Sequence, residues 1–416
     1  MRPTGKLHIG HYFGALQNWV RLQNDPEYDC FYFIADWHAL TSDYADTSAV
    51  AQNTIEIVTD YLAAGLDPKK CIIFQQSLIP EHAELHLLLS MVTPLSWLER
   101  VPTYKEAFEN VKDKDLHTYG FLGYPCLQTA DIVLYSAGAT ALVVPVGEDQ
   151  VSHVELSREI VRKFNFHNGF WMSSSVNAIP KLLNALRNVI ERSGAGLGAP
   201  VYSESELRSS VLMWANEIGH ENFLNQIATV SELAPHFGFK NILCEPEHQL
   251  TKTPRIPGLD GRKMSKSYGN AITLSESDAD IRAKTKVMKT DPQRQRRTDK
   301  GNPDVCPVYD WHKLFSPRNS SGEYSAEGKA TLEWAANGCR TAGIGCIECK
   351  AKMADHLIEW IAPVRERRLE YEKHPKRVLE VIDDGSKRAR VEAQKTIGRV
   401  REAVFGWEKK RTEIGS

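Results

Sequence analysis

Two apolar runs separated by one helix-compatible stretch constrain the fold of this chain most strongly. The runs are CFYFIADW, from Cys30, and KCIIFQQS, from Lys70, and residues 49–64 between them have helical character. Short runs rich in aromatic and β-branched residues are typical of buried strands, and two such strands joined by a helix pair in parallel. A third run, ATALVVPVGEDQ, precedes another helix-like stretch, so we expect the sheet to continue there. The pattern predicts an α/β fold with a parallel sheet.

Composition and charge limit the functional classes. The chain has 416 residues, of which 42% are hydrophobic, enough for two or three domains with cores of their own. Its 51 Lys and Arg against 53 Asp and Glu leave a net charge of -2, so any contact with nucleic acid must be local. No apolar run approaches the roughly 20 residues that span a bilayer, and the first residues include Arg2, Lys6 and His8 rather than an apolar signal core. We therefore expect a cytoplasmic protein without a membrane partner.

The composition changes at about residue 168 and again after residue 290. Residues 168–244 combine Ser-rich and Gly-rich segments with amphipathic stretches, which predicts a helical insertion. Residues 291–416 begin with a polar, Arg-rich stretch and continue into charged, helix-favouring sequence, which predicts a second, helical domain. The expected organisation is an α/β domain in two parts, 1–167 and 245–290, interrupted by the insertion and followed by the C-terminal helical domain.

The opening run PTGKLHIGHYFGAL places His8 and His11 three residues apart at the start of a helix-compatible segment. One helical turn puts both imidazoles on one side. Imidazole donors beside the backbone amides of a helix N-terminus suit the triphosphate of a nucleotide. Two histidines at this spacing are more often surface or core residues than a site, so the pair alone does not establish one.

A second motif, GRKMSKSYGN, places Lys263 and Lys266 in a glycine-flanked stretch far along the chain. Lysines on a mobile loop can close on a pyrophosphate leaving group. A solvated basic turn is the ordinary explanation for two lysines at this spacing. The two motifs together are much more specific than either alone.

These paired motifs, HIGH at His8–His11 and KMSKS at Lys263–Ser267, resemble the signatures of the class I aminoacyl-tRNA synthetases. Within that class the chain resembles the tryptophanyl-tRNA synthetases over seven ordered segments: PTGKLHIGHYFGALQNW, FIADWHALT, FQQSLIPEHAEL, YPCLQTADIVLY, VPVGEDQVSHVELSREI, TPRIPGLDGRKMSKS and CRTAGIGCIECK. The resemblance implies a Rossmann-like catalytic domain, an α-helical C-terminal domain that binds the anticodon, and a homodimer. It also implies ATP-dependent activation of L-tryptophan to tryptophanyl-adenylate, with Mg²⁺ and release of pyrophosphate, and then transfer to the 3′ end of tRNA(Trp).

The resemblance carries site residues over to this chain. The catalytic residues that it implies are His8, His11, Lys263 and Lys266. The residues implied to bind ATP come from both motifs and from the end of the third apolar run; they are Thr4, Gly10, His11, Gly147, Glu148, Asp149, Ile256, Lys263, Met264, Ser265, Lys266 and Ser267.

Choice of the amino acid is expected in YPCLQTAD, which predicts a helix that starts after Pro125. The resemblance makes Asp131 the acceptor for the indole N–H, the only hydrogen-bond donor of that ring. An exposed helix position is the alternative for Asp131, but its neighbours are apolar. The other implied contacts to tryptophan are Tyr124, Gln128, Gln150 and His38. Tyrosyl-tRNA synthetases use a similar arrangement, so this segment by itself leaves a tyrosine-specific ligase open.

Four cysteines gather in the C-terminal region. Cys339, Cys346 and Cys349 have the spacing C-x6-C-x2-C, and Cys306 precedes them. This set suits a soft metal, an iron–sulfur cluster or tetrahedral zinc, and buried cysteines without metal are the ordinary alternative. A subset of bacterial tryptophanyl-tRNA synthetases carries a [4Fe-4S] cluster on a similar pattern, and the resemblance favours that cluster over zinc, in a structural role. The gap after Cys306 is longer than in the family pattern.

Other departures and alternatives remain. The short strand that normally precedes PTG in the family is almost absent, which a truncated start would explain, and the family lacks an insertion like residues 168–244. Basic residues between 387 and 401 could follow RNA phosphates, but interspersed acids make an ordinary solvated helix equally consistent. Rival functions are a tyrosine ligase, an inactive paralogue that acts as an iron–sulfur RNA-binding or regulatory protein, and a small-molecule nucleotidyltransferase.

Overall fold

The computed structural model describes residues 1–102, 104–105, 116–136, 141–192, 203–250 and 256–415. These residues form two compact units. The first unit contains Met1–Leu78, Pro145–Glu148 and Leu250–Ala389, and the second contains Ile79–Val144, Asp149–Gln249 and Arg390–Ser416. Within the described residues, no helix has both the length and the apolar character that crossing a bilayer requires.

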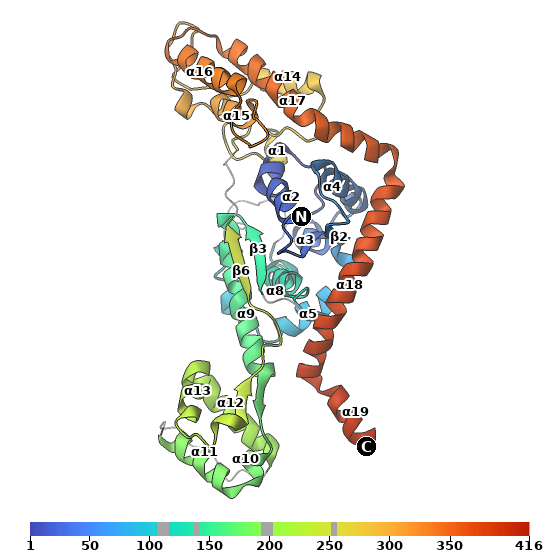
Figure 1. Cartoon of the computed structure of the whole chain (residues 1–416), viewed down its shortest axis with the longest axis vertical. Helices are drawn as coiled ribbons and strands as arrows, with labels where there is room; N and C mark the ends of the chain where they lie inside the picture. The colour runs from blue at the N-terminus through green and yellow to red at the C-terminus, as the bar shows by residue number, and fades with distance from the viewer. Residues whose placement is uncertain (103, 106–115, 137–140, 193–202, 251–255, 416) are drawn as a thin grey trace. The chain divides into compact units, whose positions relative to one another are not determined.

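The first unit is built on the predicted strand–helix–strand. Strands β1 (Cys30–Ile34) and β2 (Cys71–Gln75) pair in parallel, with Cys30 opposite Cys71. Helix α4 (Val50–Ala64) joins them and ends at Gly65, whose φ of 112° lies in the left-handed region that favours glycine. The predicted α/β fold with a parallel pair is therefore confirmed (Figure 1).

The amino terminus lies beside β1. The amino group of Met1 donates to the carbonyl of Phe33 at 2.6 Å, and the carbonyl of Met1 accepts from the N–H of Ala35 at 2.8 Å. Helix α3 (Asp36–Asp43) follows directly. Met1 is therefore hydrogen-bonded to the backbone at the end of β1.

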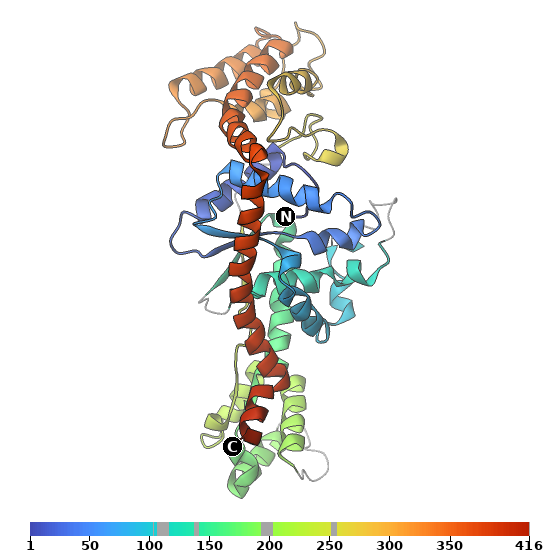
Figure 2. The same ribbon diagram turned by 90° about the vertical axis from the view of Figure 1, so that its right-hand side faces the viewer.

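Helices from the C-terminal half complete the first unit. They are α14 (Asp278–Lys286), α15 (Pro307–Phe315), α16 (Ala326–Arg340) and α17 (Cys346–Lys373), and α17 packs on α4, α14 and α15. Helices α14, α15 and α17 share one apolar core with the strands, in which Ile34, Ile73 and Trp311 are almost fully buried. Figure 2 shows the following helix, α18 (Pro375–Phe405), as a continuous element, and its residues up to Ala389 belong to this unit.

The second unit is mainly helical. It contains α5 (Glu81–Ser90), α6 (Leu95–Leu98), α8 (Tyr119–Val133) and α9 (Val151–Gly169), with α8 packed on both α5 and α9. The prediction that α8 starts after Pro125 is wrong. Thr118 caps the helix by accepting the N–H of Phe121, and Pro125 lies inside it. A proline inside a helix removes one backbone hydrogen bond and crowds the carbonyl four residues earlier, and α8 keeps its helical form while packed on α5 and α9.

The third apolar run forms β3 (Leu142–Val146), but its partner differs from the expectation. Among the described strands, β3 pairs with β6 (Pro246–Leu250) in a separate two-stranded sheet instead of extending the β1–β2 pair. The backbone N–H and C=O groups of β3 are therefore hydrogen-bonded to a segment that is distant in the sequence. The local residue pattern of β3 does not reveal this partner.

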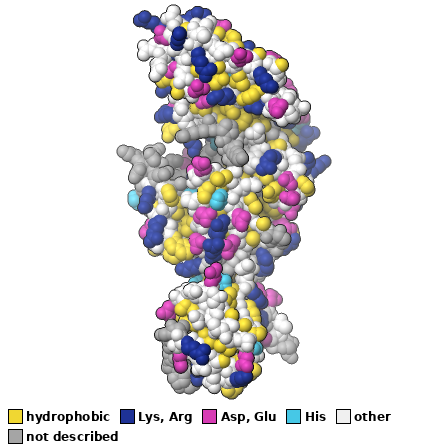
Figure 3. Space-filling view, turned by 60° about the vertical axis from the view of Figure 1, so that its left-hand side comes forward, with side chains coloured by type: hydrophobic (Ala, Val, Ile, Leu, Met, Phe, Trp, Pro, Cys, Tyr) yellow, Lys and Arg dark blue, Asp and Glu magenta, His cyan; other side chains and the backbone are white. Residues whose placement is uncertain are grey.

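Residues 170–239 have a core of their own. Helices α10 (Ser175–Ala178), α11 (Pro180–Arg192), α12 (Glu204–Ile218) and α13 (His220–Ala228) lie in one lobe (Figure 1). Their apolar faces bury Leu186, Trp214 and Phe223. An unpredicted antiparallel pair, β4 (Phe170–Met172) with β5 (Phe237–Phe239), closes the base of the segment. Figure 3 shows hydrophobic side chains among polar ones on the lowest lobe in that view.

Candidate active site

The histidine motif begins a continuous helical stretch in the first unit. Helix α1 (Ile9–His11) runs into a π-helical turn, η1 (Tyr12–Leu16), and then into α2 (Gln17–Leu22). The N–H of His8 donates to Nδ1 of His11 at 3.2 Å, and the two rings stack with centroids 3.7 Å apart. The expectation that both imidazoles lie on one side is confirmed. A π-helical turn inside a helix is frequent at functional sites.

Two glycines of this segment are required by their surroundings. A Cβ at Gly10 would lie 2.9 Å from atoms of the His8 ring, closer than side chains tolerate. Gly5 has φ +91°, a left-handed backbone conformation that favours glycine. Glycine therefore allows the close approach to the His8 ring at position 10 and the left-handed turn at position 5.

The lysine motif lies on a loop organised by one buried amide, Asn270. Its Nδ2 donates to Oδ1 of Asp260 at 2.7 Å and to the carbonyl of Lys263 at 3.1 Å, and its Oδ1 accepts the N–H of Ser265 at 2.7 Å. Hydrogen bonds from Asn270 and then from Arg262 lower the pKa of Asp260 to about 2. Sequence reasoning missed Asn270, although it follows the motif directly in SYGN.

Backbone pairing brings the two motifs together. The N–H of Ile9 donates to the carbonyl of Ile272 at 3.0 Å, and the N–H of Leu274 donates to the carbonyl of Leu7 at 2.9 Å. His8 is thereby opposite Thr273 in a short antiparallel bridge. The segment that follows the lysine loop is thus hydrogen-bonded to the segment that carries the histidines.

Lys266 makes the direct connection. Its Nζ donates to the carbonyl of Thr4 at 2.6 Å and to the carbonyl of Lys6 at 3.0 Å, and it lies 3.5 Å from Oγ1 of Thr4. The prediction that the histidine and lysine segments converge is confirmed by these contacts. Lys263 is exposed on the same loop.

The electrostatics of this cluster favour neutral histidines. Burial, and then the charge of Lys266, lowers the pKa of His8 to about 4. Burial, followed by His8 and Lys266, lowers the pKa of His11 to about 3. Because Nδ1 of His11 accepts a hydrogen bond, its proton lies on Nε2. Nδ1 of His8 is buried and has no hydrogen-bond partner among the described residues.

The other residues expected at the nucleotide lie in different surroundings. Ile256 and Met264 are 7% and 6% exposed and belong to the apolar core of the first unit. The side chain of Ser267 lies outside the described part of the structure. Gly147 and Glu148 belong to the first unit and Asp149 to the second. Their assignment to ATP stays a prediction.

In the second unit, Asp131 is a buried carboxylate at 5% exposure, so the alternative of an exposed helix position is wrong. Its Oδ1 lies 2.7 Å from Nδ1 of His82 on α5, and Nε2 of His82 lies 2.6 Å from the hydroxyl of Tyr135. Burial, and then the charge of Asp131, raises the pKa of Tyr135 well above its ordinary value. Sequence reasoning missed His82, although it belongs to the segment FQQSLIPEHAEL.

The three residues expected around the α-amino group, Tyr124, Gln128 and Gln150, all belong to the second unit, whereas His38, expected at the border of the pocket, belongs to the first. The hydroxyl of Tyr124 lies 3.3 Å from Nε2 of His153, a buried residue of α9 that was not predicted. Gln128 is half-buried on α8, and Nε2 of Gln150 donates to Oδ2 of Asp149 at 3.4 Å. His38 is buried in the first unit. Binding of tryptophan by these residues stays a prediction.

The four cysteines all belong to the first unit, as free thiols. Cys306 precedes α15, Cys339 lies in the last turn of α16, and Cys346 and Cys349 lie in the first turn of α17. Burial raises the pKa of Cys349 to about 12, and the other three thiols contribute, which shows that all four lie within electrostatic range. Among the residues described, no three His, Cys, Asp or Glu side chains are grouped so as to hold one metal ion. Zinc would require its sulfurs about 2.3 Å from a single ion, whereas a [4Fe-4S] cluster distributes four thiolates over its irons.

Comparisons with known proteins identify the family. Residues 1–186 and 225–360 match the family described as tRNA synthetases class I (W and Y). Proteins named tryptophan–tRNA ligase from Ralstonia nicotianae and Thermotoga maritima are 45% and 41% identical to this chain, over 97% of its length and over 96% and 97% of theirs. The solved structure of tryptophanyl-tRNA synthetase from Campylobacter jejuni complexed with ADP and tryptophan is similar with a TM-score of 0.68 and 26% identity, over 97% of this chain and 98% of that one. The converging histidine and lysine motifs and these matches agree: this chain belongs to the class I tRNA synthetase family of the W and Y type.

Proposed function

We propose that this chain is a tryptophan–tRNA ligase. It would activate L-tryptophan with ATP to tryptophanyl-adenylate, release pyrophosphate, and transfer the amino acid to the 3′ end of tRNA(Trp). The observation that carries the proposal is the position of the Lys266 ammonium, which is 2.6 Å from the carbonyl of Thr4 and 3.0 Å from that of Lys6, next to the histidine helix. Relatives named tryptophan–tRNA ligase at 45% and 41% identity support the choice of amino acid.

The residues of the first unit fit the charge that develops in such a reaction. Activation is an in-line displacement at the α-phosphate by the tryptophan carboxylate, in which charge passes to the departing pyrophosphate, and Mg²⁺ accompanies ATP. Neutral His8 and His11 would donate hydrogen bonds to phosphate oxygens, and the Lys266 ammonium would stabilise the charge that develops on the pyrophosphate. The other predicted nucleotide contacts, Lys263 among them, extend this site. No covalent enzyme intermediate is needed.

Tryptophan would be selected in the second unit. Asp131 would accept the indole N–H, with Tyr124, Gln128 and Gln150 at the α-amino group and His38 at the border of the pocket. A buried carboxylate is costly without a partner, and His82 beside Asp131 reduces that cost. A site built around such an acceptor discriminates strongly against ligands without the matching donor.

For the cysteines we propose a [4Fe-4S] cluster on Cys306, Cys339, Cys346 and Cys349, with zinc as the alternative. The spacing and the electrostatic proximity of the thiols support it. His312, fully buried, lies with Nε2 3.4 Å from Sγ of Cys349. The cluster would have a structural role: it would hold the helical C-terminal region in the conformation that binds the tRNA anticodon. A homodimer that acts in the cytoplasm completes the proposal.

The decisive experiment is pyrophosphate exchange into ATP, screened with all twenty amino acids, followed by charging of tRNA(Trp). We expect exchange with tryptophan alone and charging of that tRNA. Exchange that depends on tyrosine would show the other specificity of the family. No exchange with any amino acid would favour an inactive paralogue.

A further inference from the structure

One peptide group in the first unit lies between two charged side chains. The carbonyl of the Lys6–Leu7 peptide accepts from the Lys266 ammonium at 3.0 Å, and the N–H of the same peptide donates to Oδ2 of Asp60 at 2.6 Å. The dipole of the peptide therefore points its negative end at the cation and its positive end at the anion. Hydrogen bonds in such a chain polarise and strengthen one another.

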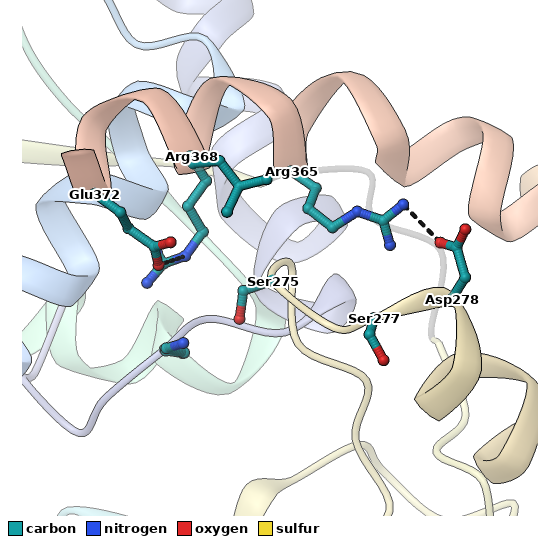
Figure 4. Close-up of a pocket in the computed structure, with 8 residues that line it drawn as sticks. Ser275, Ser277, Asp278, Arg365, Arg368 and Glu372 are labelled. Carbon is teal, nitrogen blue, oxygen red and sulfur yellow. Dashed lines mark ion pairs between the residues drawn. The ribbon is translucent and has the colours of Figure 1, made fainter.

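Asp60 is held from the other side by an arginine. Asp60 lies on α4 and is 0% exposed, and Arg368 on α17 is 1% exposed. Arg368 donates through Nη1 to Oδ1 of Asp60 and through Nη2 to Oε2 of Glu56, and its Nε lies 3.1 Å from Oε1 of Glu372. Figure 4 shows Arg368 and Glu372 side by side at the wall of a cavity of about 450 Å³, which Lys6 also lines.

The arginine keeps Asp60 charged. Burial raises the pKa of Asp60 to about 6, and the charge of Arg368 is the largest effect that opposes this rise. Asp60 in turn favours the charged form of Lys266, whose pKa burial lowers. The four groups thus form one electrostatic series, from Arg368 through Asp60 and the Lys6–Leu7 peptide to Lys266.

We propose that Asp60 is a positioning residue for Lys266. Its carboxylate fixes the Lys6–Leu7 peptide, and so fixes the carbonyl that holds the Lys266 ammonium, while Arg368 holds the carboxylate. Asp60 is fully buried, so its effect on the reaction would pass through the peptide and Lys266. The inference rests on the proposed function, because the role of Lys266 in pyrophosphate release belongs to it. It also connects the lysine loop to α17, the helix whose first turn carries Cys346 and Cys349.

The test is a double-mutant cycle on tryptophan-dependent pyrophosphate exchange in the full chain, with Asp60→Asn and Lys266→Ala alone and combined. Asp60→Asn should lower kcat about 10- to 100-fold, as expected for loss of one charge-assisted hydrogen bond, with the KM for tryptophan changed by less than about threefold. In the Lys266→Ala background the same substitution should change kcat by less than about threefold, because the group it positions is gone. Additive effects of the two substitutions would overturn the inference.

Two further variants separate charge from packing. Asp60→Asn with Arg368→Gln removes both charges but keeps two amides that can pair, so it recovers stability that the single change loses. Slow exchange in this variant at a near wild-type Tm supports the inference, and recovery of exchange together with Tm overturns it. Asp278→Asn is the matched control, because Asp278 pairs with Arg365 on the same helix and lines the same cavity, and exchange should not change. If the wild-type chain shows no tryptophan-dependent exchange, the proposed function and this inference both fail. If the wild-type chain is active but the effects of Asp60→Asn and Lys266→Ala are additive, only this inference fails.

Discussion

The proposed acceptor for the indole N–H makes a prediction that can be tested on the ligand as well as on the protein. A tryptophan analogue in which sulfur replaces the ring N–H keeps the shape of indole and removes its one donor. Asp131 is 5% exposed, so a hydrogen bond to its carboxylate would form away from water. Such bonds contribute about 1.5–3 kcal/mol, so we expect kcat/KM in pyrophosphate exchange to be about 10- to 150-fold lower for the analogue.

The protein side of this test is Asp131→Ala. The variant should lose activity with tryptophan and should no longer distinguish the two ligands, because the acceptor is absent. The substitution also removes the partner that lies 2.7 Å from the buried His82, which costs about 1–3 kcal/mol of stability. Asp131→Asn keeps the volume and one acceptor oxygen, and should discriminate to an intermediate degree.

A control is needed for stability. Thr129 is fully buried on the same helix, and its hydroxyl donates to the carbonyl of Pro125 and to Oγ of Ser157. Thr129→Val should lower Tm to a similar extent but keep the discrimination. The assignment of Asp131 is refuted if the wild-type chain uses both ligands with kcat/KM within about threefold, since a single such hydrogen bond contributes more than that, or if Asp131→Ala still prefers tryptophan.

Three further predictions concern the first unit. Lys266→Ala should slow exchange about 10²- to 10³-fold, because it removes a group that stabilises developing charge. The affinity for tryptophan, measured by equilibrium binding, should be nearly unchanged. Replacement of the exposed Lys263 by Ala should have a smaller effect on exchange. The pKa of His11 is about 3 in the folded chain against 6.5 for the unfolded group, so unfolding takes up a proton between these values. The free energy of unfolding should therefore fall as pH drops through this range, by about 1.4 kcal/mol per pH unit from this group, and His11→Gln should remove that part of the slope in thermal melts at pH 7, 6 and 5. Anaerobically purified chain should be brown with about four irons per chain, and Cys339→Ser should lose iron; a colourless, zinc-loaded chain would reverse the choice of metal.

The sequence predicts the parts of the fold that depend on local pattern. The apolar runs at Cys30 and Cys71 and the helix between them appear as β1, α4 and β2, because short unbroken runs of aromatic and β-branched residues are typical of buried strands. Strands β4 and β5 were not foreseen, since three residues such as Phe170–Met172 carry no period. The pairing of β3 with β6 joins segments far apart in the chain, and no pattern within either one names its partner.

The residues of the candidate site also divide into those that the sequence predicts and those that it does not. His8, His11 and Lys266 were found because their types and spacings are unusual, and the structure brings them together. Asn270 was missed because its function is to hold loop backbone, for which many polar residues serve. His82 was missed because a histidine in a helix gives no sign of the carboxylate it will meet until α5 and α8 are packed.

Asp60 shows what limits such reasoning. It lies in IVTDYLAAG, where most of the residues are apolar, and a charged residue within a mainly apolar stretch is a sign of a buried ion pair. The sequence therefore indicates that Asp60 is paired, but it does not name the partner. That partner is Arg368, which is more than three hundred residues away and reaches Asp60 only when α17 packs on α4. The peptide that Asp60 fixes carries no side chain that takes part, so no sequence motif could mark it. Groups that touch a substrate recur as motifs because their chemistry restricts residue type, whereas a residue that acts through a backbone hydrogen bond is recognised only from the contacts of the folded chain.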